Sequence, residues 1–363
     1  MSSGLGRLRR GFEAHVEDLY RNFKKEGKYE VYLYKGAGTS SGNEIKVFNL
    51  HRGSFLARAI AVLIRRNPYY VQNFSFFIGL IPHLIKSEVE IVYLGEPVLC
   101  NFLTKWRRLT GKKFRIIFFT GGQTIPAFVG EEDNIHHVSP LCIDKAMQRG
   151  IPEKNQFLVP HFLNLPEQPD FIDLEKRKKI KQELNIPDEA IVILSVGAID
   201  CFVKRMDYLV REVSQLQENI FLVILGEEEP ETNTVRSLAR DFFPKGNYSI
   251  KTLPRTALNN YYAIADLFVL ASLREGFGIV YIEALSYGIP VIAHDYLVTR
   301  YVLKDYGYYT DMSGENNLKN KITELIKKKN PEEEKPERYK FVYRNYSWER
   351  VKAEYDRMFS LPR

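Results

Sequence analysis

The stretch Ala271-Ser272-Leu273-Arg274-Glu275-Gly276-Phe277-Gly278 decides the fold, because it joins a short apolar run to a longer apolar segment. The run before it, residues 266–270, suits a buried parallel strand, since it is short and apolar. The segment after it, residues 279–288, has the length of a helix, and Gly288 with Pro290 would stop that helix. The order of strand, glycine turn and helix predicts a parallel α/β sheet.

Two glutamates have definite places in this unit. Glu275 lies in the turn at the carboxyl end of the strand, where ligands gather in open α/β sheets, and Glu283 lies about two turns into the helix. Gly276 and Gly278 let the backbone approach a ligand, and the first N–H groups of the helix attract an anion. This arrangement suits a diphosphate, with Glu283 on two vicinal hydroxyls, as acidic residues bind ribose. The alternative is a plain strand-turn-helix unit with surface glutamates.

The stretch resembles the E-x7-E signature of glycosyltransferase family 4, the retaining GT-B enzymes that use nucleotide-sugars. The residues that carry this resemblance are Glu275, Gly276, Phe277, Gly278, Glu283, Ala284, Gly288 and Pro290. The resemblance covers most of the chain and is strong from Leu194 to Tyr308. It implies an α/β fold of the GT-B type, in which two doubly wound Rossmann-like domains face a cleft.

The resemblance also implies which residues hold the donor. Lys204 and Arg205 follow a predicted strand and resemble the phosphate-binding basic residues of the family, although as isolated residues they would be ordinary surface charges. With Glu275 they are the expected catalytic residues. The expected donor-binding residues are Glu283, Gly276, Phe277, Gly278, Leu253, Pro254 and Arg255. Ala198 stands where family members often have arginine, and Arg205 is expected to compensate.

Length and composition fit a two-domain protein inside the cell. A chain of 363 residues is long for one core and sufficient for two. No run of 18 or more uncharged apolar residues occurs, and the first residues lack the apolar core of a signal peptide, so a cytoplasmic location is expected. Cys100, Cys142 and Cys201 lie in apolar settings without metal-ligand spacing, which predicts reduced thiols rather than disulfides.

The positive charge is concentrated in the first half of the chain. Residues 1–166 hold 23 lysines and arginines against 14 acidic residues, whereas residues 167–363 hold 29 against 31. This asymmetry predicts an anionic partner for the first half, either a phosphorylated acceptor or an anionic membrane surface. Nucleic acid is not expected as a partner, because the chain has neither zinc-finger spacing nor an RNP-like aromatic strand.

The start of the chain departs from the resemblance. The segment Gly11-Phe12-Glu13-Ala14-His15-Val16 resembles the glycine loop and following helix of the family, with phenylalanine where a second glycine often stands. Because Met1 falls close to this loop, the first domain is expected either to lack its first strand or to begin upstream of Met1. A later strand, residues 114–119, opens into Gly121 and Gly122. Gly11, Gly121 and Gly122 are therefore the expected acceptor or phosphate loops.

Two further segments of the first half allow more than one interpretation. Residues 54–86 are unusually apolar and carry flanking arginines. The favoured interpretation is a helix packed on the sheet with arginines at its solvent edge, and the alternative is an interfacial helix on anionic lipid, as in a peripheral membrane protein. His136 and His137 are predicted to lie in a short strand rather than to form a catalytic pair, since they lack metal-ligand spacing.

A linker divides the predicted domains. Residues 159–169 have the proline density of such a linker. Residues 1–165 are expected to form an N-terminal acceptor-binding domain and residues 166–340 a C-terminal nucleotide-sugar-binding domain. Residues 341–363 are expected to form a helix that crosses back to the first domain, with Ser347 as its N-cap.

The predicted function is retaining transfer of a sugar, in glycan biosynthesis. A nucleotide-diphosphate sugar would be the donor and a glycan, a lipid-linked molecule or a small molecule the acceptor. Fixed cations and helix amides would stabilise the leaving nucleotide diphosphate, so neither a metal nor a cofactor is expected. The alternative is a non-catalytic nucleotide- or glycan-binding module, a degenerate transferase. Ala198 and the Gly11-Phe12 pair favour this alternative, and the two intact glutamates oppose it.

Overall fold

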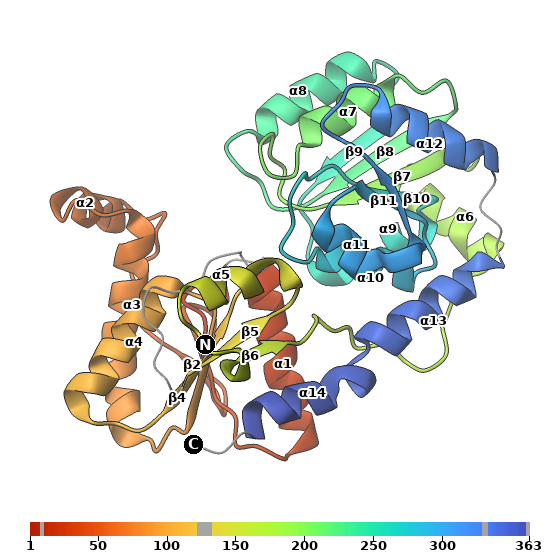
Figure 1. Cartoon of the computed structure of the whole chain (residues 1–363). Helices are drawn as coiled ribbons and strands as arrows, with labels where there is room; N and C mark the ends of the chain where they lie inside the picture. The colour runs from red at the N-terminus through yellow and green to blue at the C-terminus, as the bar shows by residue number, and fades with distance from the viewer. Residues whose placement is uncertain (8–10, 122–132, 329–332, 361–363) are drawn as a thin grey trace. The chain divides into compact units, whose positions relative to one another are not determined.

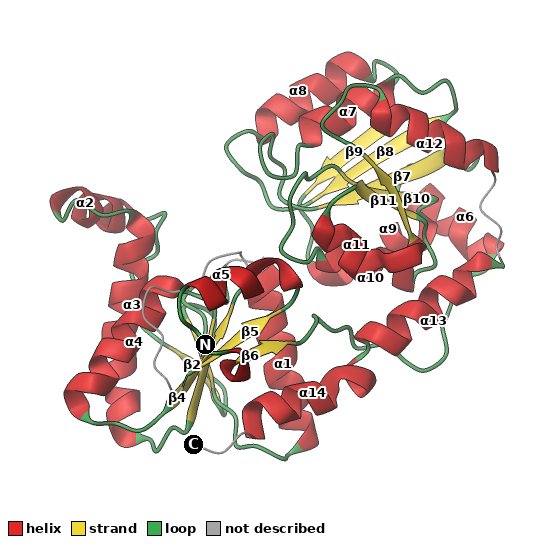
Figure 2. Cartoon of the chain, in the orientation of Figure 1, coloured by secondary structure: helices red, strands yellow, loops and turns green. Residues whose placement is uncertain are grey.

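The computed structural model of the chain describes residues 1–7, 11–121, 133–328 and 333–360 (Figure 1). The chain divides into two compact units. The first consists of Met1–His161 and Ala353–Arg363, and the second of Phe162–Lys352. Each unit combines parallel strands with helices, so the predicted α/β class is confirmed (Figure 2).

The first unit contains two parallel sheets. The larger has the order β3-β4-β5-β6 and the smaller pairs β1 with β2. Their strands are β1 (Leu33–Lys35), β2 (Glu44–Lys46), β3 (Ile91–Leu94), β4 (Arg115–Phe119), β5 (Asn134–His137) and β6 (Gln156–Leu158). The helices of this unit are α1 (Gly11–Glu26), α2 (Phe55–Leu63), α3 (Pro68–Lys86), α4 (Pro97–Thr110), α5 (Ile143–Gln148) and the end of α14 (Trp348–Ser360). The prediction of a short strand at His136 and His137 is confirmed.

The first residues of the chain take part in this architecture. The Ser2 backbone N–H donates to the Tyr34 carbonyl of β1 at 3.1 Å, and the Met1 ammonium donates to the Tyr93 carbonyl of β3 at 2.8 Å. The Ser3 N–H and hydroxyl both donate to the buried Glu96 carboxylate at 2.7 Å. Among the described residues no strand precedes α1, as expected, although Ser2 forms an isolated bridge to Lys35 and the first residues bond to β1 and to β3.

A buried core and a buried ion pair hold the first unit together. Phe76 and Leu80 of α3 pack with Leu99 of α4 and with apolar side chains of the sheet, all fully or almost fully buried. Arg107 of α4 donates two hydrogen bonds to the Asp133 carboxylate, at 2.7 and 2.8 Å. This bidentate pair is 6% and 2% exposed, so loss of either partner would leave an uncompensated buried charge.

The segment at residues 54–86 differs from the favoured interpretation. It forms two helices, and the first of them, α2, packs on α3 rather than on a sheet. In Figure 1, α2 stands out from the rest of the first unit at the end of α3. Among the residues that the structure describes, no helix combines the length and the hydropathy required to cross a bilayer. The three thiols are free, and Cys100 and Cys142 are buried as expected, whereas Cys201 is partly exposed.

The second unit is built on one parallel sheet with the order β12-β11-β10-β7-β8-β9. Its strands are β7 (Ile191–Val196), β8 (Ile220–Leu225), β9 (Tyr248–Lys251), β10 (Leu267–Leu270), β11 (Val291–His294) and β12 (Gly307–Thr310). Its helices are α6 (Leu174–Glu183), α7 (Met206–Ser214), α8 (Thr232–Phe242), α9 (Leu258–Ile264), α10 (Ile279–Ser286), α11 (Leu297–Leu303), α12 (Asn317–Lys328), α13 (Glu334–Tyr346) and the start of α14. In Figure 2, helices cover both faces of this sheet.

The strand order of the second unit indicates where a ligand site is expected. From β7 the chain winds outward to β8 and β9, and it then returns to the other side of β7 to add β10, β11 and β12. The winding direction therefore reverses between β7 and β10. In open α/β sheets the crevice at such a reversal, beyond the carboxyl ends of the strands, is the place where ligands bind.

A buried chain of hydrogen bonds crosses the carboxyl ends of the strands in the first unit. His136 Nε2 lies 2.8 Å from the Val159 carbonyl, and His136 Nδ1 lies 2.8 Å from the Tyr93 hydroxyl. His15 Nε2 lies 3.0 Å from the same hydroxyl, and His15 Nδ1 lies 3.2 Å from Nδ1 of His161. A carbonyl oxygen only accepts, so His136 Nε2 must carry a proton and donate it to Val159. It follows that His136 Nδ1 accepts from the Tyr93 hydroxyl, the Tyr93 oxygen accepts from His15 Nε2, and His15 Nδ1 accepts from His161.

This arrangement requires neutral histidines. Burial lowers the pKa of His136 to about 3, opposed by the hydrogen bond to the Val159 carbonyl and assisted by the neighbouring His137. Burial also lowers the pKa of His15 well below its ordinary value, with the nearby His161 and His136 acting in the same direction. A proton on either ring would disrupt the chain of donors and acceptors and leave a charge without water.

We expect acid to destabilise the first unit because of these rings. The pKa of His136 is depressed on folding, so the folded state binds fewer protons, and stability that is present above about pH 6.5 is lost as the pH falls toward about 3. Chemical denaturation between pH 7 and pH 5 measures the slope, and His136→Gln should reduce it by up to about 1 kcal/mol per pH unit.

His83→Gln is the control, because His83 lies in α3, apart from this hydrogen-bonded chain. It should leave the slope unchanged. Equal pH slopes in the wild type and in His136→Gln would contradict the neutral, buried state of this ring.

Candidate functional site

The carboxyl ends of β7 and β10 bring together two loops that carry predicted site residues. Leu267 and Phe268 of β10 pair in register with Ile193 and Leu194 of β7. The loop at residues 197–205 follows β7 and leads into α7, and the loop at residues 271–278 follows β10 and leads into α10. Because parallel strands end at the same edge of a sheet, both loops lie at the point where the strand order reverses.

The two loops are joined by an ion pair between predicted site residues. Lys204 Nζ lies 2.5 Å from Oε1 of Glu275, with side chains that are 20% and 10% exposed. A charge-assisted hydrogen bond of this kind is short and strong, and its partial burial reduces screening by water and salt. The structure therefore brings together Lys204 and Glu275, which are 71 residues apart in the chain.

Asp200 holds the lysine loop in place. Its Oδ1 accepts the backbone N–H groups of Phe202, Val203 and Lys204, at 2.9, 2.5 and 2.9 Å. The residue is 6% exposed, and α7 begins soon after these three amides. One carboxylate thus satisfies several backbone donors and fixes the position from which Lys204 reaches Glu275.

Two glycines allow the close approach of this loop to the next strand. A Cβ atom on Gly226, which follows β8, would lie 1.6 Å from the carbonyl oxygen of Gly197. A Cβ atom on Gly197 would in turn press on the side chain of Lys204 at 3.3 Å. A larger residue at position 226 would therefore displace the loop that carries Lys204.

The glycine turn after β10 presents backbone rather than side chains. Gly278 has a φ of +79° directly before α10, and a Cβ atom there would lie 2.4 Å from the ring of Tyr281. The Phe277 side chain is buried, with its ring centroid 5.8 Å from that of Tyr346. The turn therefore contains all three predicted donor-binding residues Gly276, Phe277 and Gly278. Because the side chain of Phe277 is buried, this residue can contact a ligand only through its backbone.

Glu283 belongs to a second polar cluster of the same unit. Its carboxylate accepts a hydrogen bond from the Tyr262 hydroxyl of α9 at 3.0 Å and one from Arg255 at 3.2 Å. Burial, followed by the nearby Glu283 charge, raises the pKa of Tyr262 well above its ordinary value, so the phenol stays protonated and donates. Arg255 begins a 3-10 turn after Leu253 and Pro254, so the predicted base loop and the predicted ribose residue are neighbours.

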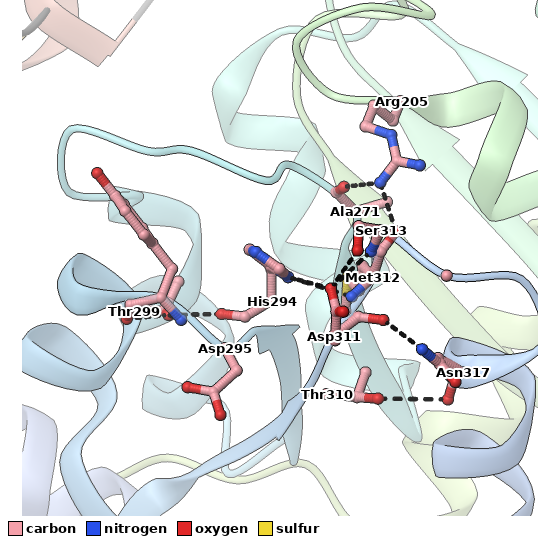
Figure 3. Close-up of polar contacts among 12 residues, drawn as sticks. Arg205, Ala271, His294, Asp295, Thr299, Thr310, Asp311, Met312, Ser313 and Asn317 are labelled. Carbon is pink, nitrogen blue, oxygen red and sulfur yellow. Dashed lines mark hydrogen bonds and ion pairs between the residues drawn. The ribbon is translucent and has the colours of Figure 1, made fainter.

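Arg205 is tied to the backbone of its own unit. Its NH1 group donates to the Met312 carbonyl at 2.6 Å and to the Ala271 carbonyl at 3.5 Å. Its guanidinium carbon also lies 4.3 Å from the centre of the Tyr208 ring. Figure 3 shows the guanidinium beside Ala271 and the segment that follows β12. Arg205 therefore links three loops of the sheet edge, and it does so from a left-handed backbone with a φ of +52°.

A histidine at the same edge was not predicted from the sequence. His294, the last residue of β11, accepts the Met312 backbone N–H on Nδ1 at 3.1 Å, and this Nδ1 lies 3.6 Å from Asp311 (Figure 3). Asp311 also accepts the Ser313 N–H and hydroxyl at 2.9 and 2.7 Å. A polar residue at the end of an apolar strand was the available signal for His294, since such positions lie at the carboxyl edge of the sheet.

Asp200 and Tyr262 were also missed. Asp200 lies four residues after the end of β7, in the loop at the carboxyl edge of the sheet, and this position was its available signal. Tyr262 had no such signal, because its partner Glu283 lies on another helix.

The predicted loop glycines lie in the first unit and have different surroundings. Gly11 begins α1 and has open space where a side chain would stand. A Cβ atom on Gly121 would lie 2.1 Å from the Phe119 ring, whereas Gly122 lies outside the described residues. Phe12 stacks on Phe119 with 5.3 Å between ring centroids, so it fills the space that a second glycine would leave open.

Comparisons with known proteins agree with this arrangement. Residues 176–345 match the model of the family described as "Glycosyl transferases group 1". The chain is 28% identical over 286 residues to the alpha-monoglucosyldiacylglycerol synthase of Streptococcus pneumoniae (strain ATCC BAA-255 / R6), covering 76% of this chain and 62% of that protein. It is 24% identical over 249 residues to the alpha-galactosylglucosyldiacylglycerol synthase of the same strain, covering 65% of this chain and 64% of that protein.

Solved structures show the same fold. The sucrose-phosphate synthase of Thermosynechococcus elongatus superposes with a TM-score of 0.73 at 17% identity, covering 96% of this chain and 93% of that chain. At this identity the likeness concerns the fold alone. With the parallel sheets of both units, it confirms the predicted GT-B class with two Rossmann-like domains.

We expect Asp200→Ala to destabilise the second unit by about 2–4 kcal/mol, because it removes the acceptor of three backbone N–H groups at once. Chemical denaturation at neutral pH measures this difference. Asp241→Ala, an exposed position at the end of α8, is the matched control and should change stability by less than about 0.5 kcal/mol. Equal effects of the two substitutions would show that the loop does not depend on Asp200.

Proposed function

We propose that the chain is a retaining, metal-independent glycosyltransferase, because residues 176–345 match the model of the glycosyl transferases group 1 family. The donor is a nucleotide-diphosphate sugar, and the acceptor is a glycan, a lipid-linked molecule or a small molecule. The observation that carries the proposal is the Lys204–Glu275 pair at the reversal of the strand order, 2.5 Å apart. It places one cation and one carboxylate where a Rossmann-like sheet binds the phosphates of a nucleotide.

In this proposal each part of the donor, namely base, ribose, diphosphate and sugar, contacts a different group of residues in the second unit. Glu283 takes the two ribose hydroxyls, with Tyr262 and Arg255 holding its carboxylate in position. The loop at residues 253–255 takes the base largely through its backbone, so the identity of the base does not follow from side chains. Lys204 and the amides of the glycine turn take the diphosphate, and Glu275 takes hydroxyls of the sugar.

Catalysis is electrostatic in this proposal. The leaving nucleotide diphosphate gains negative charge, which Lys204 and the first N–H groups of α10 stabilise as it develops. The acceptor hydroxyl attacks from the face of the leaving group, and the departing phosphate takes its proton, so the configuration at the sugar carbon is retained. Arg205 adds positive charge nearby, and its hydrogen bonds to two carbonyls keep the three loops in register.

The comparisons favour a lipid-linked acceptor. The names of both streptococcal relatives describe glycosylated diacylglycerols. The chain spans somewhat less than two thirds of the length of each relative, so their substrates are carried to it as part of the proposal. The net positive charge of residues 1–166 agrees with an acceptor that is phosphorylated or lies in an anionic surface.

A non-catalytic nucleotide-binding module is the second candidate. Two departures from the family pattern favour it: Ala198 stands where an arginine is often found, and Phe12 fills the space of a second glycine. Such a module would bind a nucleotide diphosphate without turning over a donor sugar, so binding and turnover together separate the two candidates.

We expect one of UDP, GDP, ADP, dTDP or CMP to raise the melting temperature of the full chain, and to do so in the presence of a chelator. A ligand that binds only the folded state adds about 2.7 kcal/mol at one hundred times its dissociation constant. Glu283→Ala should lower the affinity for this nucleotide at least tenfold, a loss of about 1.4 kcal/mol or more in binding free energy, and the melting shift should shrink accordingly.

Glu324→Ala is the control for this experiment, because Glu324 is an exposed residue of α12 in the same unit. It should respond as the wild type does. If no nucleotide stabilises the chain, the donor site is wrong, and with it the proposed function.

We expect Lys204→Met to lower kcat by about 100-fold or more, because it removes a fixed charge that stabilises the leaving group. Turnover of the nucleotide-sugar identified by the melting experiment measures this effect, and NMR of the product gives its anomeric configuration. Lys321→Met on α12 is the control. Inversion at the sugar carbon would exclude the retaining mechanism, and nucleotide binding without turnover of any offered donor would favour the non-catalytic module.

A further inference from the structure

Large apolar side chains cover the solvent face of α2. Phe55 is 87% exposed, Val62 80% and Leu63 83%, and Leu56 is 53% exposed. With the exposed Ala59 they occupy positions i, i+1, i+4, i+7 and i+8 of the helix, which lie on one side of an α-helix. We call these five residues the apolar face of α2.

The opposite side of α2 is buried through small residues. Ala57 and Ala61 are 0% and 1% exposed and pack against Val71 of α3. A surface helix ordinarily turns its large apolar residues toward the core and its polar residues toward water. In α2 this pattern is reversed: its small residues pack against α3, and its large apolar residues face the solvent.

The reversed helix is held firmly in this orientation. Ser54 caps its start by accepting the Ala57 backbone N–H at 3.2 Å, and Asn67 caps α3 by accepting the Tyr70 N–H at 2.8 Å. Between the two helices, the Arg66 backbone N–H donates to the Ala61 carbonyl at 2.9 Å. These bonds, together with the close packing of Ala57 and Ala61 on α3, favour the orientation in which the apolar face of α2 points to solvent.

The charges around the apolar face have one sign. Residues 45–87 contain no aspartate or glutamate and include six basic residues, namely Lys46, Arg52, Arg58, Arg65, Arg66 and Lys86. Arg58, Arg65 and Arg66 are exposed on α2 or directly after it. This segment alone has a net charge of +6, against +7 for the whole chain.

We propose that the apolar face of α2 docks into the surface of an anionic lipid bilayer, with Arg58, Arg65 and Arg66 on the lipid headgroups. An apolar face bordered by arginines is the pattern of helices that lie in a membrane interface. Nine residues are far too few to span the hydrocarbon core, so α2 lies on the membrane rather than crossing it. Each arginine near an anionic surface adds attraction that salt weakens.

A second copy of the chain suits this surface less well. Two apolar faces brought together would also bring together their arginines, and like charges across an interface oppose association. No acidic residue of the segment is available to offset them. The proposal rests on α2 and its neighbours and does not depend on the transfer reaction, although it would place a lipid-linked acceptor near the first unit.

Vesicle sedimentation with the full chain tests the proposal. The chain should bind vesicles of equimolar phosphatidylcholine and phosphatidylglycerol, and should bind phosphatidylcholine alone at least tenfold more weakly. The double variant Phe55→Ser/Leu63→Ser should lower partitioning into the anionic vesicles at least tenfold. Arg65→Gln/Arg66→Gln should reduce the preference for anionic over neutral vesicles by about tenfold.

The matched control is Leu109→Ser/Leu174→Ser, which removes two leucines that are 87% and 78% exposed outside α2. It should bind vesicles as the wild type does. Circular dichroism and the nucleotide-dependent melting shift show that the variants are folded, and they report on the donor site separately from the membrane.

Two results would overturn the proposal. One is equal vesicle binding by the α2 double variant and the wild type. The other is a wild-type dimer that becomes a monomer in the α2 double variant, as measured by light scattering, with no binding to vesicles by either. In that case the apolar face of α2 joins two copies of the chain.

Discussion

The contact between Lys204 and Glu275 is the constraint on which the candidate site depends. It joins the loop after β7 to the loop after β10, the two strands between which the winding of the sheet reverses. Asp200 fixes the lysine side of the contact through three backbone amides, and Gly226 leaves the space that this loop occupies. The candidate site therefore depends on both loops of the sheet edge, since the ion pair takes one charge from each.

The first unit is organised around a different requirement, the burial of neutral polar groups. His15, Tyr93, His136 and His161 share one chain of hydrogen bonds that ends on a backbone carbonyl. Each donor meets an acceptor only while every ring is uncharged, so burial and neutrality support each other. The same unit carries its positive charge at the surface, and α2 combines that charge with an exposed apolar face.

Much of the fold and part of the site were predictable from the sequence. The glycine turn between an apolar strand and a helix predicted the α/β class, and Glu275 and Lys204 were correctly placed in loops at the carboxyl ends of strands. The outward orientation of α2 was not predictable, because its apolar pattern fits a helix packed on a sheet equally well. The partners of Asp200 were also hidden, because its position after β7 indicates the edge of the sheet but not the three amides that it accepts.

The sequence alone determined what is local: where strands and helices alternate, which turns need glycine, and which half of the chain carries the positive charge. These follow from residue type and spacing along the chain. Only the tertiary structure decided which distant residues meet, as Lys204 meets Glu275, and which face of α2 is buried. The physical reason is that such contacts depend on the order of strands in a sheet and on how closely two helices pack, and neither quantity is written in any short stretch of sequence.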